Sequence, residues 1–198
     1  MTNSQKLGIL IVLSTFLWVL FSIGKYWLAD VRYAEGQKHT QFFQKTQNSQ
    51  YLLSAYNNYS RAYRLNRGEP AIASEYAVST AYLALALQIR DATAASQLAQ
   101  QSLSLSQSAI TISPRHPNYY KSQARALILL SSLDPRYLQI AADTLQKAIA
   151  ISPTDPRIPY NLGIIYKYLN ATPSSILYLQ ASLKLKPDFF DAQDQLSN

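Results

Sequence analysis

The sequence predicts an all-α protein in which one N-terminal transmembrane helix is followed by a stack of helical hairpins. Three observations predict this: an uncharged apolar run near the N-terminus, a proline-bounded segment that recurs along the rest of the chain, and a helix-favouring composition. Only five glycines occur, whereas Ala, Leu, Ser, Gln and Tyr are common. The 198 residues suffice for one membrane helix and one soluble domain of about 150 residues.

The predicted membrane helix is the apolar run of residues 7–24, which contains no charged side chain. Eighteen helical residues span about 27 Å, close to the hydrocarbon thickness of a bilayer. Lys6 and Lys25 flank the run, and Tyr26 and Trp27 follow it, where aromatic rings favour the membrane interface. We therefore assign residues 1–28 to an N-terminal tail and a single membrane span, with residues 7–28 in contact with the membrane. A cleaved signal peptide is the alternative, although its apolar core would be shorter.

The charges around the span leave the membrane side of the following domain open. Lys25, Arg32 and Lys38 after the span outnumber Lys6 before it, which favours a cytoplasmic domain. A short positive tail before a large domain is, however, also typical of a signal anchor. The domain is poor in charge and rich in Ser, Gln, Tyr and Asn, so we expect it to be extracytoplasmic.

The recurring segment occupies residues 62–70, 109–117, 148–156 and 182–188. Each copy ends a predicted helix with a small residue followed by aliphatic residues. Proline then stops the helix, because it cannot continue one, and a second proline fits the first turn of the next helix. The stops are Pro114, Pro153 and Pro187, with Arg67 in the first copy, and the openings are Pro70, Pro117 and Pro156.

The distance from Pro153 to Pro187 is 34 residues, which is the tetratricopeptide period. On residues 50–190 the chain resembles the tetratricopeptide repeat (TPR) family. In the last repeat the motif positions fall on Leu162, Gly163, Tyr166, Ser175, Leu179, Ser182 and Pro187. The resemblance implies a right-handed α-solenoid of TPR-like hairpins, with the first helix of each hairpin on a concave face. The alternative is an unrelated helical bundle.

The repeats divide the chain after the membrane helix. We expect a degenerate first hairpin at 29–69, whose first helix continues from the membrane span. TPR-like repeats follow at 70–116, 117–155 and 156–189, and residues 190–198 form a short C-terminal helix or tail. Such a short final helix leaves apolar surface exposed, which would suit self-association or a fragment of a longer array.

A narrower resemblance concerns residues 27–36, 112–125, 133–137 and 153–163. They resemble the last transmembrane helix and TPR tail of bacterial O-antigen ligase/polymerase-family proteins. The polytopic glycosyl-transfer part of those proteins is absent from this sequence, so no transferase activity is implied. The resemblance implies an accessory or truncated tail module in assembly of a cell-envelope polysaccharide, with a glycan as an alternative ligand.

No catalytic or metal-binding constellation is recognisable. Cysteine is absent, and the only two histidines, His39 and His116, lie far apart in the sequence. The acidic residues of the proline turns are explained as helix caps, and no phosphate loop or nucleophile elbow occurs. We therefore predict a protein that is not an enzyme and holds no metal or cofactor. The net charge of +7 forms no basic run, which excludes nucleic acid and suits anionic lipid near the anchor.

The predicted partner site is a concave groove of basic and aromatic residues. It would take a protein or peptide partner carrying an acidic group, or a glycan stacked on Tyr rings; ordinary solvated Lys and Arg with interhelical Tyr is the alternative. The function that follows is a membrane-anchored scaffold for protein–protein interaction. The lining comprises Val78, Tyr82, Lys121, Arg125, Ile128, Arg157, Tyr160, Ile164, Lys167 and Tyr168.

Overall fold

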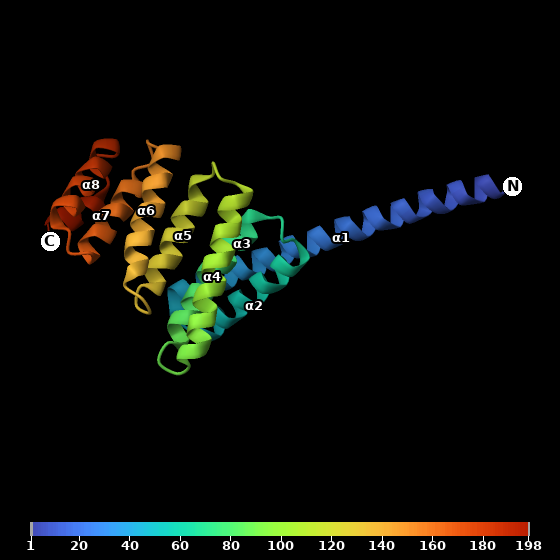
Figure 1. Ribbon diagram of the computed structural model, residues 1–198, viewed down its shortest axis with the longest axis horizontal. Helices are drawn as coiled ribbons and strands as arrows, with labels where there is room; N and C mark the ends of the chain where they lie inside the picture. The colour runs from blue at the N-terminus through green and yellow to red at the C-terminus, as the bar shows by residue number, and fades with distance from the viewer. Residues whose placement is uncertain (1, 198) are drawn as a thin grey trace. The chain divides into compact units, whose positions relative to one another are not determined.

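The computed structural model describes residues 2–197, and within them every regular element is an α-helix (Figure 1). The chain divides into two compact units, Met1–Arg67 and Gly68–Asn198, which are described separately below as unit 1 and unit 2. The predicted all-α fold is confirmed, as is the long apolar helix at its N-terminal end.

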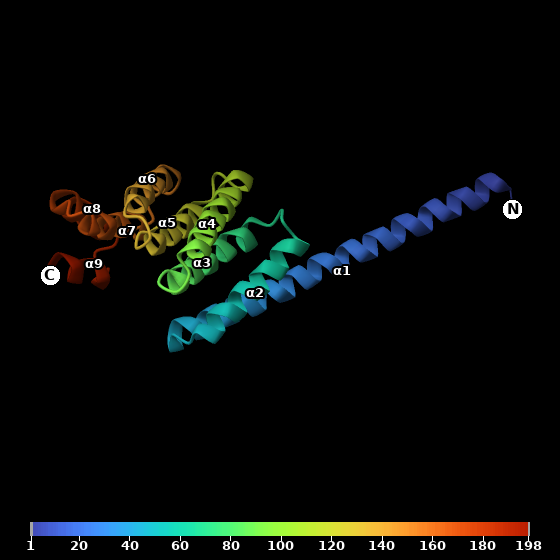
Figure 2. The ribbon, with the colours of Figure 1, turned by 60° about the horizontal axis from the view of Figure 1, so that its bottom comes forward.

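Unit 1 is a hairpin of two very unequal helices, α1 (Asn3–Thr46) and α2 (Ser49–Leu65). The 44 residues of α1 run unbroken from the apolar segment into the hairpin. Within residues 2–197, α1 is the helix long and apolar enough to cross a membrane, and no residue of its most apolar 18-residue stretch is buried. Gln47 ends α1 in the left-handed conformation, with φ 54°. The chain then reverses, and α2 runs back along α1 (Figure 2).

The two helices of unit 1 approach closely where Gly36 faces Tyr59. A Cβ on Gly36 would lie 2.6 Å from a ring carbon of Tyr59, whose side chain is buried. The Tyr59 hydroxyl lies 3.1 Å from Oγ1 of Thr40. Further from the apolar segment, the ring of Tyr51 packs at 5.3 Å from that of Phe42. These contacts fix the antiparallel register of α2 on α1.

We expect Gly36→Leu to loosen the hairpin of unit 1, because the added side chain would occupy the position of the Tyr59 ring. The measurement is amide hydrogen exchange of the full-length protein in detergent micelles. Protection should fall by at least tenfold in α2 and remain unchanged in the hairpins of unit 2. Gly24→Leu is the matched control, since nothing lies within 4 Å of a Cβ at that position. Equal exchange in both variants would contradict the proposed close contact.

Unit 2 consists of three stacked hairpins and a final short helix (Figures 1 and 2). The first helix of each hairpin starts at, or directly after, a proline, as the repeat predicts. The first of these helices ends at Leu87, because residues 88–90 form a turn before Asp91. The helices are α3 (Pro70–Leu87), α4 (Ala92–Ile112), α5 (Pro117–Leu130), α6 (Arg136–Ile151), α7 (Arg157–Tyr168), α8 (Thr172–Leu185) and α9 (Phe190–Ser197).

Acidic side chains and one residue with a left-handed backbone define helix ends of unit 2. Asp91 accepts a hydrogen bond from the Ala94 amide at 2.9 Å, and Asp134 accepts one from the Arg136 amide at 3.0 Å. At the end of α7, Asn170 adopts a left-handed conformation with φ 56°. The following amide, of Ala171, donates back to the Tyr166 carbonyl at 2.9 Å, which closes a Schellman motif. Local sequence chemistry thus sets the turns that orient successive helices.

Small residues and aliphatic side chains form the core of unit 2. The buried Ser102 hydroxyl of α4 donates to the Ala77 carbonyl of α3 at 2.8 Å, so these backbones lie close together. The fully buried Leu127, Leu145 and Leu162, from α5, α6 and α7, belong to one core cluster. The second and third hairpins therefore share a core, and this fixes the position of α5 relative to α7.

Candidate functional site

The candidate site is a groove of about 510 Å³ in unit 2, formed mainly by α5 and α7 with one residue each from α3 and α6. Residues 118, 121, 122, 125, 128 and 129 recur at three- and four-residue intervals along α5 and so share one helical face. Four of the predicted residues line it, namely Lys121, Arg125, Ile128 and Arg157. The other lining residues are Glu75, Asn118, Ser122, Ala124, Leu129, Leu145 and Asn161.

A row of polar side chains in the groove was missed by the sequence analysis. Glu75, Ser122 and Asn161 each lie five residues after the proline that opens α3, α5 or α7. Equivalent positions in stacked hairpins line up across the array, so the three side chains form a row over three helices. Counting from the opening proline would have identified this row, since the repeat itself was recognised.

Lys121 is paired within the protein. Its Nζ lies 2.8 Å from Oδ2 of Asp155, and the two side chains are only 16% and 10% exposed. Arg157 donates to the same carboxylate from Nε at 2.9 Å. Burial raises the pKa of Asp155, but the hydrogen bonds from Arg157 and Lys121 outweigh burial and hold that pKa well below its usual range. The triad of Lys121, Asp155 and Arg157 therefore ties α5 to the start of α7.

Arg125 and Glu75 are the charged groups in the middle of the groove. Arg125 donates to the Tyr82 hydroxyl at 3.1 Å, and its guanidinium carbon lies 5.6 Å from the centre of that ring. Burial raises the pKa of Glu75, and the nearby positive charge of Arg125 counteracts part of that rise. Among residues 2–197, no Lys, Arg or His forms an ion pair with Glu75. A ligand can thus meet one carboxyl and one guanidinium group side by side.

The remaining predicted residues lie outside this groove. Val78 belongs to the core cluster shared by α3, α4 and α5, and is 3% exposed. Ile164 is half-buried on α7, whereas Tyr168 is 62% exposed. Tyr160 packs against Phe189, with ring centres 5.0 Å apart, and Lys167 donates to Gln195 of α9 at 3.1 Å. The structure therefore places Tyr160 and Lys167 against the C-terminal segment.

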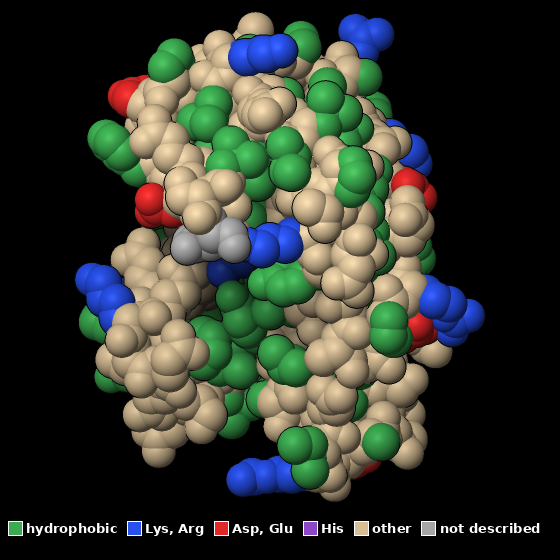
Figure 3. Space-filling view, turned by 90° about the vertical axis from the view of Figure 1, so that its left-hand side faces the viewer, with side chains coloured by type: hydrophobic (Ala, Val, Ile, Leu, Met, Phe, Trp, Pro, Cys, Tyr) green, Lys and Arg blue, Asp and Glu red, His purple; other side chains and the backbone are tan. Residues whose placement is uncertain are grey.

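A second cavity of about 800 Å³ lies between the start of α7 and the C-terminal segment. Arg157 and Asn161 border both cavities, while Lys186 and Phe189 border only this one. The side of unit 2 that carries α8 and α9 shows hydrophobic side chains between basic ones (Figure 3). The exposed apolar residues of α8 and α9 include Ile176, Leu177, Leu185 and Phe190.

Comparison with known proteins identifies the fold. No family model and no curated protein matches the sequence. One similar structure is YrrB, described as a TPR protein with an unusual peptide-binding site. The match covers 86% of this chain and 75% of the YrrB chain, at 14% identity and a TM-score of 0.58. The match to PilF of Pseudomonas aeruginosa covers 85% of this chain and 66% of the PilF chain, at 14% identity and a TM-score of 0.58. The match to MamA of Desulfovibrio magneticus covers 82% of this chain and 81% of the MamA chain, at 17% identity and a TM-score of 0.52.

The chain has the tetratricopeptide fold. The motif positions of its last TPR hairpin bring α7 and α8 together. A Cβ on Gly163 would lie 2.7 Å from Cγ of Leu179, and the buried Ser182 hydroxyl donates to the Pro156 carbonyl at 2.7 Å. These contacts leave no room for larger side chains between the helices. The TPR groove is thus supported from behind by closely packed second helices.

Within residues 2–197, no group of three or more His, Asp or Glu side chains is arranged to hold a metal ion. His116 stacks on Tyr119 with ring centres 4.5 Å apart. In the TPR groove itself, amide, hydroxyl, guanidinium and carboxyl groups are available at the surface. This set of donors and acceptors suits binding of a polar, extended chain.

Proposed function

We propose that the protein is a membrane-anchored TPR scaffold whose groove, lined by α3, α5 and α7, binds an extended segment of a protein partner. The observation that carries the proposal is the row of Glu75, Ser122 and Asn161 across three successive first helices. An extended peptide exposes backbone N–H and C=O groups at regular intervals, and such a row offers matching acceptors and donors. The likeness to YrrB, a TPR protein with a peptide-binding site, agrees with this proposal.

The charges of the groove indicate what kind of peptide fits. Because Asp155 pairs with both Lys121 and Arg157, the groove is less basic than its sequence suggests. Arg125 remains for an acidic side chain of the partner, and Glu75 for a basic side chain or an N–H donor. We propose a partner segment that carries an acidic residue next to a basic or donor residue.

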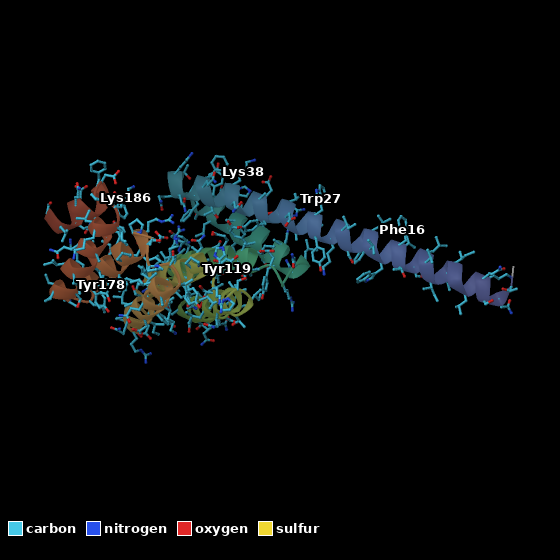
Figure 4. All side chains as sticks on the ribbon, turned by 90° about the horizontal axis from the view of Figure 1, so that it is seen from above. Phe16, Trp27, Lys38, Tyr119, Tyr178 and Lys186 are labelled. Carbon is cyan, nitrogen blue, oxygen red and sulfur yellow. The ribbon has the colours of Figure 1, made fainter. Side chains whose placement is uncertain are left out.

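The membrane anchor is the second part of the proposal. Residues 7–28 belong to α1 and expose large apolar side chains that no other part of unit 1 covers, including Leu17, Trp18 and Phe21. Phe16 and Trp27 project from this isolated stretch (Figure 4). Burial of these side chains in a bilayer would remove a large apolar area from water. An extracytoplasmic position, a role beside an O-antigen ligase, glycan binding and self-association remain predictions.

Site-specific photocrosslinking in native membranes tests the groove. A photoreactive residue at Ser122, half-buried in the groove, should form a discrete adduct with one protein. Arg125→Ala combined with Asn161→Ala should reduce that adduct at least fivefold, because two of the side chains that the peptide meets are removed.

The control is the same photoreactive residue at Lys147, which is exposed on α6 and outside the groove. It should give no such adduct. Equal adducts at both positions, or an adduct insensitive to the double substitution, would exclude the groove as the binding site. Circular dichroism of the double variant must match that of the wild type, so that unfolding is not mistaken for lost binding.

A further inference from the structure

The positive charge of the protein is concentrated in unit 1. Residues 1–67 contain eight Lys and Arg but two Asp and Glu, so they carry +6 of the total charge of +7. Seven of the eight basic residues lie after the apolar run: six are on α1 and α2, and Arg67 is in the turn after α2. Unit 1 is therefore strongly basic next to its apolar segment, whereas unit 2 is almost neutral.

Three arginines of this set come from the end of α2 and the turn that follows. Arg61, Arg64 and Arg67 are all exposed. In α2, Leu52, Ala55, Tyr59 and Ala62 form the buried face, and at 100° per residue Arg61 and Arg64 point away from it. The acidic residues of unit 1 leave them unpaired: Glu35 lies beside His39, and neither Glu35 nor Asp30 forms an ion pair with an arginine.

The antiparallel register brings these arginines back toward the apolar segment. Tyr51 contacts His39 and Phe42, whereas Tyr59, later in α2, contacts Tyr33 and Thr40. Continuing this register places the end of α2, with Arg61 and Arg64, level with α1 residues of about 27–34, and Arg67 follows in the turn after α2. At 1.5 Å per residue, that level lies about 5–15 Å beyond the end of the apolar run at Gly24. The headgroup region is about 5–8 Å thick on each side of the hydrocarbon core. If the run spans a bilayer, the near end of this range therefore lies among the phospholipid headgroups, and the far end lies within the reach of an extended arginine side chain from them.

We propose that Arg61, Arg64 and Arg67, with Lys25 and Arg32 of α1, form a binding surface for the phosphates of anionic phospholipids. The inference rests on the proposed membrane anchor and goes beyond it, because it names the lipid class that the hairpin contacts. Guanidinium groups bind phosphate through charge-assisted hydrogen bonds and lie favourably against an anionic leaflet. Two attachments, the span and this surface, would fix how α2 lies on the membrane.

The test uses the full-length protein in nanodiscs, with one fluorophore on α2. The chain has no cysteine, so Asn57→Cys gives a single labelling site, exposed on α2 and one turn before Arg61. Quenching by a headgroup spin-labelled lipid should be stronger in discs of phosphatidylcholine with phosphatidylglycerol than in phosphatidylcholine alone. Added salt should weaken the difference. Arg64→Gln with Arg67→Gln should remove at least half of it.

Lys38→Gln with Lys45→Gln is the matched control. It removes the same charge from unit 1 at exposed positions of α1 that lie about 20–30 Å beyond Gly24 (Figure 4 shows Lys38). This control should retain the lipid-dependent difference. The proposal would be overturned by equal quenching of the wild type in the two kinds of disc, or by an equal loss of the lipid-dependent difference in both double variants. Recruitment of an acidic protein instead would appear as a salt-sensitive complex in phosphatidylcholine discs.

Alkaline carbonate extraction of native membranes separates this inference from the anchor on which it rests. A protein that remains in the membrane but shows no preference for phosphatidylglycerol contradicts the lipid surface alone. A protein that is extracted contradicts the anchor, and with it the position of the arginines at headgroup depth. The photocrosslinking result at Ser122 is independent of both.

Discussion

Replacing Asp155 with alanine is expected to destabilise unit 2 by about 2–3 kcal/mol, which is less than the cost for a fully buried ion pair because Arg157 is largely exposed. The substitution removes the carboxylate that binds Lys121, whose side chain is only 16% exposed, and leaves that ammonium group without a counter-charge. It also removes the acceptor for the Arg157 amide at the start of α7. Urea unfolding of the full-length protein in detergent, followed by far-UV circular dichroism, measures the change.

The pH dependence of stability gives a second test of the same triad. Since the pKa of Asp155 is lowered in the folded protein, its contribution is fully present above the ordinary carboxyl pKa of about 3.9 and is lost progressively as the pH falls from there toward the lower pKa of the folded state. Asp155→Asn should therefore show a flatter decrease in stability on acidification below about pH 5 than the wild type. An unchanged acid profile would mean that the triad does not stabilise the fold.

Asp134→Ala is the matched control for the first experiment and Asp134→Asn for the second. Asp134 also lies in a proline turn, binds the arginine two residues later and accepts its amide hydrogen. Its partner Arg136 is 87% exposed, however, and no lysine from another helix joins them. We expect a clearly smaller loss of stability at this position. Equal losses at Asp134 and Asp155 would show that capping, and not the link to Lys121, is responsible.

The helices could be predicted because prolines act locally. Pro117 opens α5 and Pro156 directly precedes α7, since proline fixes its own φ and tolerates only the first turn of a helix. The unbroken continuation of α1 beyond the apolar run was predicted for a similar reason: neither proline nor an early stop signal interrupts residues 25–46. Helices whose ends are set by residues close in the sequence can therefore be predicted from a single sequence.

The groove was only partly predictable, because it depends on contacts between helices. Asp155 was assigned as a cap, and it does bind the Arg157 amide, but its pairing with Lys121 joins residues 34 positions apart. Val78 and Arg125 each lie eight residues after an opening proline, yet Val78 lies in the core and Arg125 on the groove. The position of a residue in the repeat indicates the direction in which its side chain points. Whether that side chain is exposed depends also on its type and on the length of the neighbouring helices.

Replacing Gly163 with leucine should destabilise unit 2 by about 3 kcal/mol, because a core without free space responds to an inserted side chain by displacing helices. Already the Cβ would lie 2.7 Å from Leu179 Cγ and 3.2 Å from the Ser175 carbonyl oxygen, and the latter belongs to the backbone of α8. Thermal unfolding in detergent should show a lower melting temperature, and the adduct at Ser122 should weaken as α7 shifts. Gly24→Leu, with nothing within 4 Å, should leave both unchanged.

Gly163→Ala distinguishes steric crowding from other effects of the glycine. Alanine favours a helix by about 1 kcal/mol over glycine, so without crowding this substitution would stabilise α7. We expect destabilisation instead, and we expect the double variant Gly163→Ala with Leu179→Ala to lose less stability than the two single variants together. This sign follows because truncating Leu179 vacates the space that the new methyl group needs. Strict additivity, or a stabilising Gly163→Ala, would show that Leu179 does not crowd this position and that the glycine at residue 163 has another cause.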